Sequence, residues 1–169
     1  FALSHGVNYG KLKKRNIDDR EIFLNSLIKK NKKFTFNILG YANEQPKWNY
    51  EFYKEIAKCK MALNLSRGRA MKYYSSNRIA SLVANGIMTF IDEKVGYSDF
   101  FDTNEMGFYK DVEDLLTQLD RLYSNVNKVN QISKNGKKRY FSIFNNLIIS
   151  EYIISKTFNK KSKFKYVWE

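Results

Sequence analysis

The chain has 169 residues, of which 43% are hydrophobic and 16% aromatic, and its formal net charge is +13. This length supports one core of ordinary size, so we expect one folded domain over residues 1–158 and a basic tail over residues 159–169. No apolar run approaches the roughly 18 to 20 residues of a membrane span. The single cysteine, Cys59, excludes an internal disulfide and a cysteine metal cluster. These features predict a soluble or membrane-peripheral protein of a reducing compartment.

The positive charge is compatible with a phosphate-bearing partner, because clustered Lys and Arg attract phosphates at long range. Lysine is, however, scattered through every segment and accompanies many Asn, Ile, Tyr and Phe residues, a mixture that AT-biased codon usage produces without selection for a partner. We therefore interpret most of the charge as a solvated basic surface. Two clusters stand out, "KLKKR" at residues 11–15 and the C-terminal tail.

The first elements in chain order form one strand-helix step. The opening "FALSHG" lacks the charged region and long apolar segment of a signal peptide, and we expect a fragment cut from a longer protein. Residues 1–6 are predicted to form a strand that ends at a glycine. Residues 18–31 are predicted to form a helix, because acidic residues occupy its first turn and lysines its last.

The hydrophobic period then alternates between that of strands and that of helices. "KFTFNILG" at residues 33–40 predicts a strand, and Asn49 can start the next helix. "KMALNLS" at residues 60–66 and "IMTFID" at residues 87–92 predict two further strands. The helix between them, within "KYYSSNRIASLVANG", is predicted to end where Gly86 takes a left-handed conformation.

The C-terminal part is predicted to be mainly helical. "MGFY" at residues 106–109 is expected to add an edge strand, and Asp111 is expected to cap a helix over residues 111–125. The later helical region is expected to break or bend near Gly136 and near residues 145–146. The apolar residues of the last helix exceed what one stripe buries, so some should face outward; they are Leu147, Ile148, Ile149, Ile153, Ile154 and Phe158.

Strands that alternate with helices of this length predict an α/β fold, a Rossmann-like parallel sheet of at least four strands with flanking helices, from which the C-terminal helices extend. In such sheets ligands bind outside the carboxyl ends of the strands. The loops expected there are residues 4–11, 40–48, 66–78 and 92–101. Arg67, Lys72 and Arg78 are therefore expected near the ligand-binding edge.

The start of the helix in "KYYSSNRIASLVANG" combines several anion-binding groups. Ser75 or Ser76 can cap the helix and leave backbone N–H groups facing the loop, which favours a phosphate. Arg78 can add a bidentate contact to the same anion. The alternative is that a serine only caps the helix and Arg78 only reaches solvent, and the motif alone leaves both interpretations open.

The first loop, "SHGVNYGK", carries a weaker signal of the same kind. Gly6 allows backbone to approach a ligand and Lys11 can meet a diphosphate, but the spacing is not that of a Walker A motif. His5, the only histidine, is better interpreted as a structural group. Tyr41 and Trp48 can stack on a base, although packing is the better interpretation for both. No set of residues has metal-ligand spacing, so we expect no metal.

Four segments follow one another in order: "KMALNLSRGRAMKYYSSNRIASLVANGIMTFIDE", an aromatic-acidic loop, "MGFYKDVEDLLTQL" and "NGKKRYFSIFN". This ordered series resembles the C-terminal domain of group 1 glycosyltransferases of the GT-B fold over about residues 34–158. In that family two Rossmann-like domains face each other, and the C-terminal one holds the nucleotide-sugar donor. The resemblance implies a donor-binding half of a hexosyltransferase that needs an N-terminal acceptor-binding domain as its partner. It also implies a nucleotide-diphosphate-sugar as substrate, no cofactor and no nucleic acid. The site residues that it and the loops point to are Gly6, Lys11, Arg67, Lys72, Tyr74, Ser75, Ser76, Asn77, Arg78 and Ser81.

The same resemblance implies a cytoplasmic location, extending to the inner face of the membrane, and an acceptor such as a cell-surface polysaccharide or lipopolysaccharide. It further implies that outward apolar residues of the last helix form a docking face for the acceptor-binding domain.

The sequence departs from the family at two glutamates, eight positions apart, the second of which holds the ribose hydroxyls in relatives. Tyr73 and Ser81 occupy the corresponding positions. Either a hydroxyl such as that of Ser81 substitutes, or the donor site has drifted. An alternative function is therefore a catalytically inactive nucleotide- or sugar-binding module. A nucleic-acid-binding domain rests on charge alone and lacks an aromatic-glycine RNA signature or a helix-turn-helix pattern.

Overall fold

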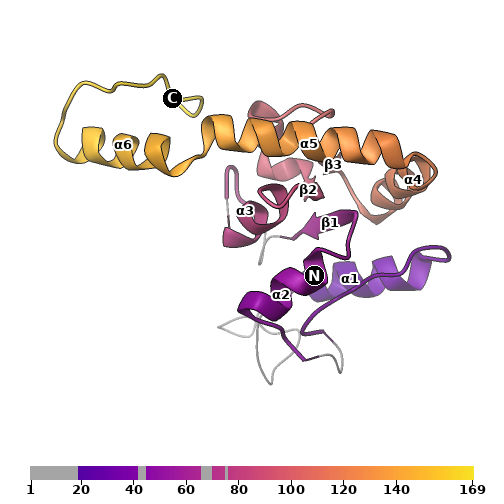
Figure 1. Cartoon of the computed structure of the whole chain (residues 1–169). Coiled ribbons are helices and arrows are strands. Elements are labelled where there is room, and N and C mark those ends of the chain that lie inside the picture. Colours follow the sequence, from indigo (N-terminus) through magenta and orange to yellow (C-terminus); the bar gives the residue numbers. More distant parts are fainter. Residues whose placement is uncertain (1–18, 42–44, 66–69, 75) are drawn as a thin grey trace.

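The computed structural model describes residues 19–41, 45–65, 70–74 and 76–169. Figure 1 shows a small sheet between helices, with the last helix reaching beyond it. The elements, in chain order, are α1 (Asp19–Lys30), α2 (Asn49–Ile56), β1 (Met61–Asn64), α3 (Asn77–Val83), β2 (Met88–Asp92), the 3-10 turns η1 (Glu93–Val95) and η2 (Tyr97–Asp99), β3 (Gly107–Tyr109), α4 (Val112–Tyr123), α5 (Val126–Ile143) and α6 (Asn146–Thr157).

The three strands form one parallel sheet in the order β1-β2-β3. Met61 lies opposite Met88, and Phe90 lies opposite Gly107. A Cβ atom on Gly107 would lie 2.4 Å from a ring carbon of Phe90, so glycine is required where the edge strand β3 passes the central strand. The parallel α/β, Rossmann-like class and the predicted edge strand at residues 106–109 are confirmed.

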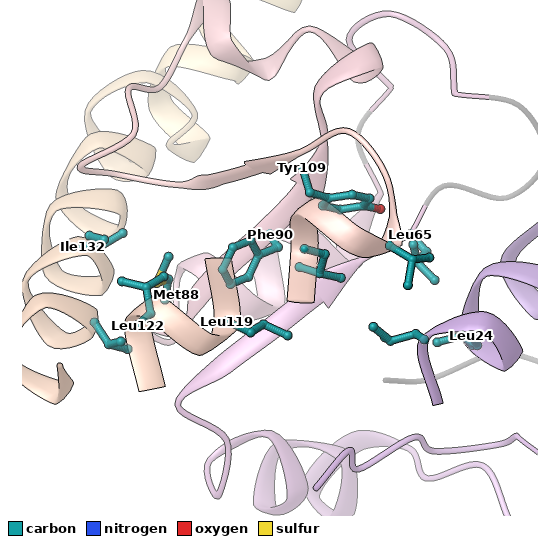
Figure 2. Close-up of a cluster of buried hydrophobic side chains, with 12 residues drawn as sticks. Leu24, Leu65, Met88, Phe90, Tyr109, Leu119, Leu122 and Ile132 are labelled. Atoms are coloured by element: carbon teal, nitrogen blue, oxygen red, sulfur yellow. The ribbon is translucent and has the colours of Figure 1, made fainter. Parts of the chain in front are cut away.

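The sheet is covered on both faces because the side chains of β2 alternate between two clusters. Met88 and Phe90 pack with Leu24 of α1 and with apolar residues of α4 and α5. Figure 2 shows Phe90 between Met88 and Tyr109 in this cluster. Ile91 points to the other face, where it packs with Ile79 of α3 and with residues of the 3-10 turns. The nearly complete burial of β2 is typical of a central parallel strand.

The strand predicted over residues 33–40 is wrong. Residues 34–38 have no ladder, and only Leu39 takes part in a bridge. The side chain of Asn31 accepts the N–H of Phe34 at 2.9 Å and donates to the carbonyl of Phe34 at 2.5 Å, so local bonds replace ladder bonds there. The described residues thus contain three strands, not the predicted four or more, and the predicted strand at residues 1–6 lies outside the described residues.

Several of the helix predictions are confirmed. Asp111 caps α4 as predicted, accepting the N–H of Asp114 at 2.9 Å, and Gly86 has a φ of 73° after α3. The predicted break at residues 145–146 separates α5 from α6. Of the break or bend predicted near Gly136, the break is wrong, because α5 continues through this residue. A Cβ atom there would lie 2.2 Å from the carbonyl oxygen of Glu105, so Gly136 permits close packing instead of ending the helix.

Helix α6 continues past the end of the sheet and is followed by a tail that folds back along it (Figure 1). Tyr152 of α6 meets the rings of Tyr166 and Trp168 edge-on, and Trp168 stacks on Phe144. The predicted outward apolar residues include Leu147 and Phe158, each 66% exposed. None of the helices in the described ranges combines the length and hydropathy of a bilayer-spanning segment.

Candidate functional site

Arg78 lies at the carboxyl edge of the sheet, in the first turn of α3. Its Nη1 donates a hydrogen bond of 2.6 Å to the carbonyl oxygen of Leu65, the residue that follows β1. This bond fixes the guanidinium beside the end of the strand, so the alternative in which Arg78 only reaches solvent does not hold. Burial, and to a lesser extent the charge of Arg20, lower the pKa of Arg78.

Arg20 brings a second positive charge to this edge. It lies in the first turn of α1 and is only 6% exposed. Arg20 precedes Leu24 by four residues, as Arg78 precedes Leu82, so each arginine lies one turn before a leucine on the same helix face. Leu24 and Leu82 line one cavity, together with Arg78. The charge of Arg20 acts on Arg78, so the two arginines lie near one another beside this cavity.

Asn64, the last residue of β1, is a buried polar residue in this region. It is 3% exposed, and its side-chain oxygen has no hydrogen-bond partner among the described residues. Ala62, two residues earlier on the same face of the strand, packs with Leu82 of α3. One helical turn back from Leu82 is Arg78, so Asn64 faces the start of α3. An unsatisfied buried acceptor costs roughly 1–3 kcal/mol, which makes Asn64 a candidate for hydrogen bonding to a bound group.

A second cluster joins the segment before α3 to the turn η2. The hydroxyl of Tyr73 donates to Asp99 at 2.5 Å, and the ammonium of Lys72 lies 3.6 Å from the same carboxylate. The hydrogen bond from Tyr73 and then the charge of Lys72 lower the pKa of Asp99. Tyr73 has a φ of 62°, and this left-handed conformation is strained for a bulky residue and is found preferentially at functional sites.

Gly96 makes this arrangement possible. Its φ is 72°, and a Cβ atom would lie 3.3 Å from side-chain carbons of Lys72. The N–H of Tyr73 donates to the carbonyl of Val95 at 2.8 Å, which holds the two loops together. A carboxylate thus lies next to Tyr73, the position at which the resemblance identifies a missing glutamate.

The predicted site residues do not all converge. Tyr74 and Asn77 are exposed beside Arg78, and Ser76 is the cap residue of α3, although its side chain makes no capping bond. Ser81 lies one turn further along, and its hydroxyl donates to the carbonyl of Asn77 at 3.0 Å. Gly6, Lys11, Arg67 and Ser75, like His5, lie outside the described residues.

The cavity beside Arg78 has a volume of about 580 Å³. It lies between β1, α1, α2, the extended residues 34–38, α4 and the start of α5, and its lining is mostly apolar. Of the aromatic residues considered for base stacking, Tyr41 packs against the main cluster and bonds to Asn25, as the packing interpretation predicted. Trp48 is 55% exposed at the start of α2.

Sequence reasoning missed Arg20, Asn64 and Asp99 as site residues. Asp99 lies in one of the loops expected at the carboxyl edge, and that position was a usable signal. Nothing in the sequence marks Arg20 or Asn64, because their importance depends on contacts between segments far apart in the chain. Within the described ranges no three His, Cys, Asp or Glu side chains are grouped so that they could hold a metal ion.

The chain has an open α/β sheet of the Rossmann-like class, and in such sheets ligands bind outside the carboxyl ends of the strands, where Arg78 lies. A family model described as glycosyl transferase-like matches residues 15–146, and the chain belongs to this family. Searches of curated proteins and of solved structures found no match.

Proposed function

We propose that the chain is the donor-binding domain of a GT-B glycosyltransferase, which transfers a hexosyl group from a nucleoside-diphosphate sugar. The observation that carries the proposal is the position of Arg78, held by the Leu65 carbonyl at the carboxyl edge of a domain of this family. Arginine is suited to a diphosphate because its planar guanidinium can make two parallel hydrogen bonds to phosphate oxygens.

The role proposed for Arg78 is to stabilise the leaving group. In the transfer the acceptor oxygen forms a bond to the anomeric carbon of the sugar, while the bond from that carbon to the diphosphate oxygen breaks. The electron pair of the broken bond stays on the diphosphate, which also takes up the proton that the acceptor hydroxyl loses. A guanidinium held in place by the Leu65 carbonyl before the donor binds can stabilise the developing charge without reorganisation. Arg20 adds to the positive potential beside Arg78. The side-chain oxygen of Asn64 is available to accept a hydrogen bond from a bound hydroxyl.

The proposal includes an acceptor-binding domain as partner, because the resemblance implies that a GT-B enzyme holds donor and acceptor between two domains. Acceptors in keeping with the resemblance are cell-surface polysaccharides and lipopolysaccharides. A cytoplasmic location, where nucleotide sugars are made, belongs to the same proposal.

A second candidate function is a nucleotide- or sugar-binding module without catalysis. The observation that favours it is the use of Tyr73 and Ser81, the positions of the two missing glutamates, in bonds within the protein. The two functions differ in one measurable property, since both bind the donor but only the first leads to its consumption.

Isothermal titration of the chain with a panel of nucleoside-diphosphate sugars tests the proposal. We expect one nucleotide class to bind, and the matching nucleoside monophosphate, which lacks one phosphate, to bind at least tenfold more weakly. Equal affinity for mono- and diphosphate would contradict a diphosphate site at Arg78. Release of free nucleoside diphosphate from the bound donor, followed chromatographically in the presence of the acceptor-binding domain, separates the enzyme from the inactive module.

A further inference from the structure

The apolar cavity follows the outer edge of β1 from one end of the strand to the other. Lys60 directly precedes the strand and Arg78 is bonded to the carbonyl of Leu65 directly after it, and both Lys60 and Arg78 line the cavity. A strand rises about 3.3 Å per residue, so the four residues of β1 give the cavity a length of roughly 13 Å. Residues 34–38 line it too but make no ladder with β1. The cavity is therefore elongated.

The walls of this cavity are supplied mainly by apolar side chains of three helices, among them Leu24 of α1, Phe52 of α2 and Leu119 of α4. Its volume of about 580 Å³ is within the range of small-molecule sites. An ordered water needs two to four polar partners, which apolar walls do not supply, and an empty cavity leaves the walls without van der Waals contacts. The interior is therefore suited to an apolar occupant.

The amino end of the cavity is positively charged and open to solvent. Lys33, Lys58 and Lys60 line the cavity, and the last two directly precede β1. Lys33 and Lys58 each lie within 3.0 Å of a carboxylate. Lys60 is exposed and forms no ion pair with any residue that the structure describes. Cys59, beside it, is only half-buried and also lines the cavity. An unneutralised ammonium group thus lies at the accessible end.

We propose that the cavity binds a straight-chain fatty acid, with the hydrocarbon chain along β1 and the carboxylate at Lys60. A single unbranched chain matches an elongated apolar space, and its one anionic group matches the one lysine at this end that lacks a carboxylate partner among the described residues. An extended peptide would fit the length as well, but it would bring backbone polar groups along both of its sides, and only the edge of β1 could bond to one of them.

Calorimetry with hexanoate, octanoate, decanoate and dodecanoate, each below its micelle-forming concentration, tests the proposal. We expect one molecule to bind per protein chain, with an affinity that rises by about fourfold for each added methylene group, because each one is buried against apolar walls. An affinity that does not rise with chain length would overturn the proposal.

The position of the carboxylate is tested with Lys60→Gln. This variant should bind dodecanoate about two- to fivefold more weakly and bind the neutral dodecanol like the wild type. The matched control is Lys29→Gln, which removes the same charge from an exposed lysine of α1 that does not line the cavity. Equal losses in both variants would mean that dodecanoate responds to overall charge alone, and an equal loss for dodecanol would mean that the carboxylate does not lie at Lys60. Either result overturns the placement.

Cys59 reports whether the ligand occupies this cavity. It is the only cysteine of the chain, so alkylation of the protein with a maleimide measures the access to one known position. Burial raises the pKa of the Cys59 thiol, so the rate is measured at alkaline pH. Dodecanoate at ten times its dissociation constant should slow alkylation about tenfold, and butanoate should not. An unchanged rate when calorimetry shows saturation would place the fatty acid elsewhere and overturn the proposal.

Hydrogen exchange tests the alternative that residues 34–38 pair with β1 and fill the cavity themselves. We expect the amide hydrogens of residues 35–38 to exchange rapidly in the protein without ligand, because they have no ladder bonds. Protection as strong as that of β2 would show that the cavity is closed in solution and would overturn the proposal. These experiments need no nucleotide, so their result is independent of the proposed donor site.

Discussion

Arg78 has two tasks at once, because the guanidinium proposed to bind the diphosphate also donates to the Leu65 carbonyl. A substitution therefore affects both ligand affinity and stability, and a loss of binding alone cannot identify its role. Variants that separate charge from hydrogen-bond geometry are required.

We expect Arg78→Ala to lower the free energy of unfolding by about 1–3 kcal/mol, because the carbonyl of Leu65 loses a charged donor. Its affinity for a nucleoside diphosphate, measured by calorimetry on the folded fraction, should fall at least about tenfold. Arg78→Lys keeps the positive charge but loses the planar guanidinium that makes two parallel hydrogen bonds, so its affinity should lie between those of Arg78→Ala and the wild type. Arg121→Ala, which removes an exposed arginine of α4, is the control. Unaltered affinity in folded Arg78→Ala would contradict the proposed role.

Among the elements, the helices could be predicted from sequence because their signals are local. The acids and lysines at the ends of α1, the cap at Asp111 and the leucine period of α4 all lie within a few residues of the structure they specify. The strand predicted over residues 33–40 is wrong because a strand needs a neighbouring strand to bond with. The alternation of Phe34, Phe36 and Ile38 predicts that one face is buried, but it does not predict hydrogen bonding to another strand. The break predicted at Gly136 is wrong for a similar reason. A glycine is needed there because the carbonyl of Glu105, in another segment, lies close to it.

We expect Gly136→Ala to destabilise the fold by about 1–3 kcal/mol, because the new methyl group would overlap the backbone of residue 105 and force α5 away from it. Chemical denaturation measures this loss. Asn130→Ala, at an exposed position of the same helix, provides the comparison and should be neutral or slightly stabilising. If both variants gain stability, helix propensity alone governs this position and the close approach has no energetic weight.

Glu55 connects α2 to its surroundings through Lys47, Lys58 and Asn37. These hydrogen bonds, led by that from Lys47, lower its pKa from 4.5 to about 2. A carboxyl whose pKa falls on folding stabilises the protein above its unfolded pKa, and this contribution is lost as the pH falls through the folded value. The stability difference between wild type and Glu55→Gln should therefore shrink between pH 4.5 and about 2. A difference that stays constant over this range would show that the bonds do not form.

At the scale of the whole molecule, the candidate site was only partly predictable. Its location at the carboxyl edge follows from the alternation of strands and helices, and Arg78 follows from its place after a strand. The participation of Arg20, Asn64 and Asp99 depends on how α1, β1 and η2 meet, which no local pattern specifies.

Catalysis requires donor and acceptor to be held together, and much of an enzymatic rate comes from that proximity. We therefore expect residues 1–169 alone to bind a nucleotide sugar without transferring it, and transfer to appear when the acceptor-binding domain is joined to them. Parallel assays of the two proteins with the same donors measure this. Comparable transfer by residues 1–169 alone would refute the need for a second domain.

The order β1-β2-β3 follows the order of the strands in the chain, and this has a consequence for how the protein folds. Each strand pairs with the next one in sequence, so each pairing closes only the crossover between neighbouring strands and loses less chain entropy than a pairing of more distant strands would. Phe90 and Ile91 of β2 contribute to the cores on opposite faces of the sheet, so the two cores cannot open separately without exposing this strand. The amide hydrogens of β2 should exchange with solvent only on global unfolding, while those of α6 should exchange through local opening. Hydrogen exchange followed by mass spectrometry measures both rates, and we expect the exchange of β2 to be the slower.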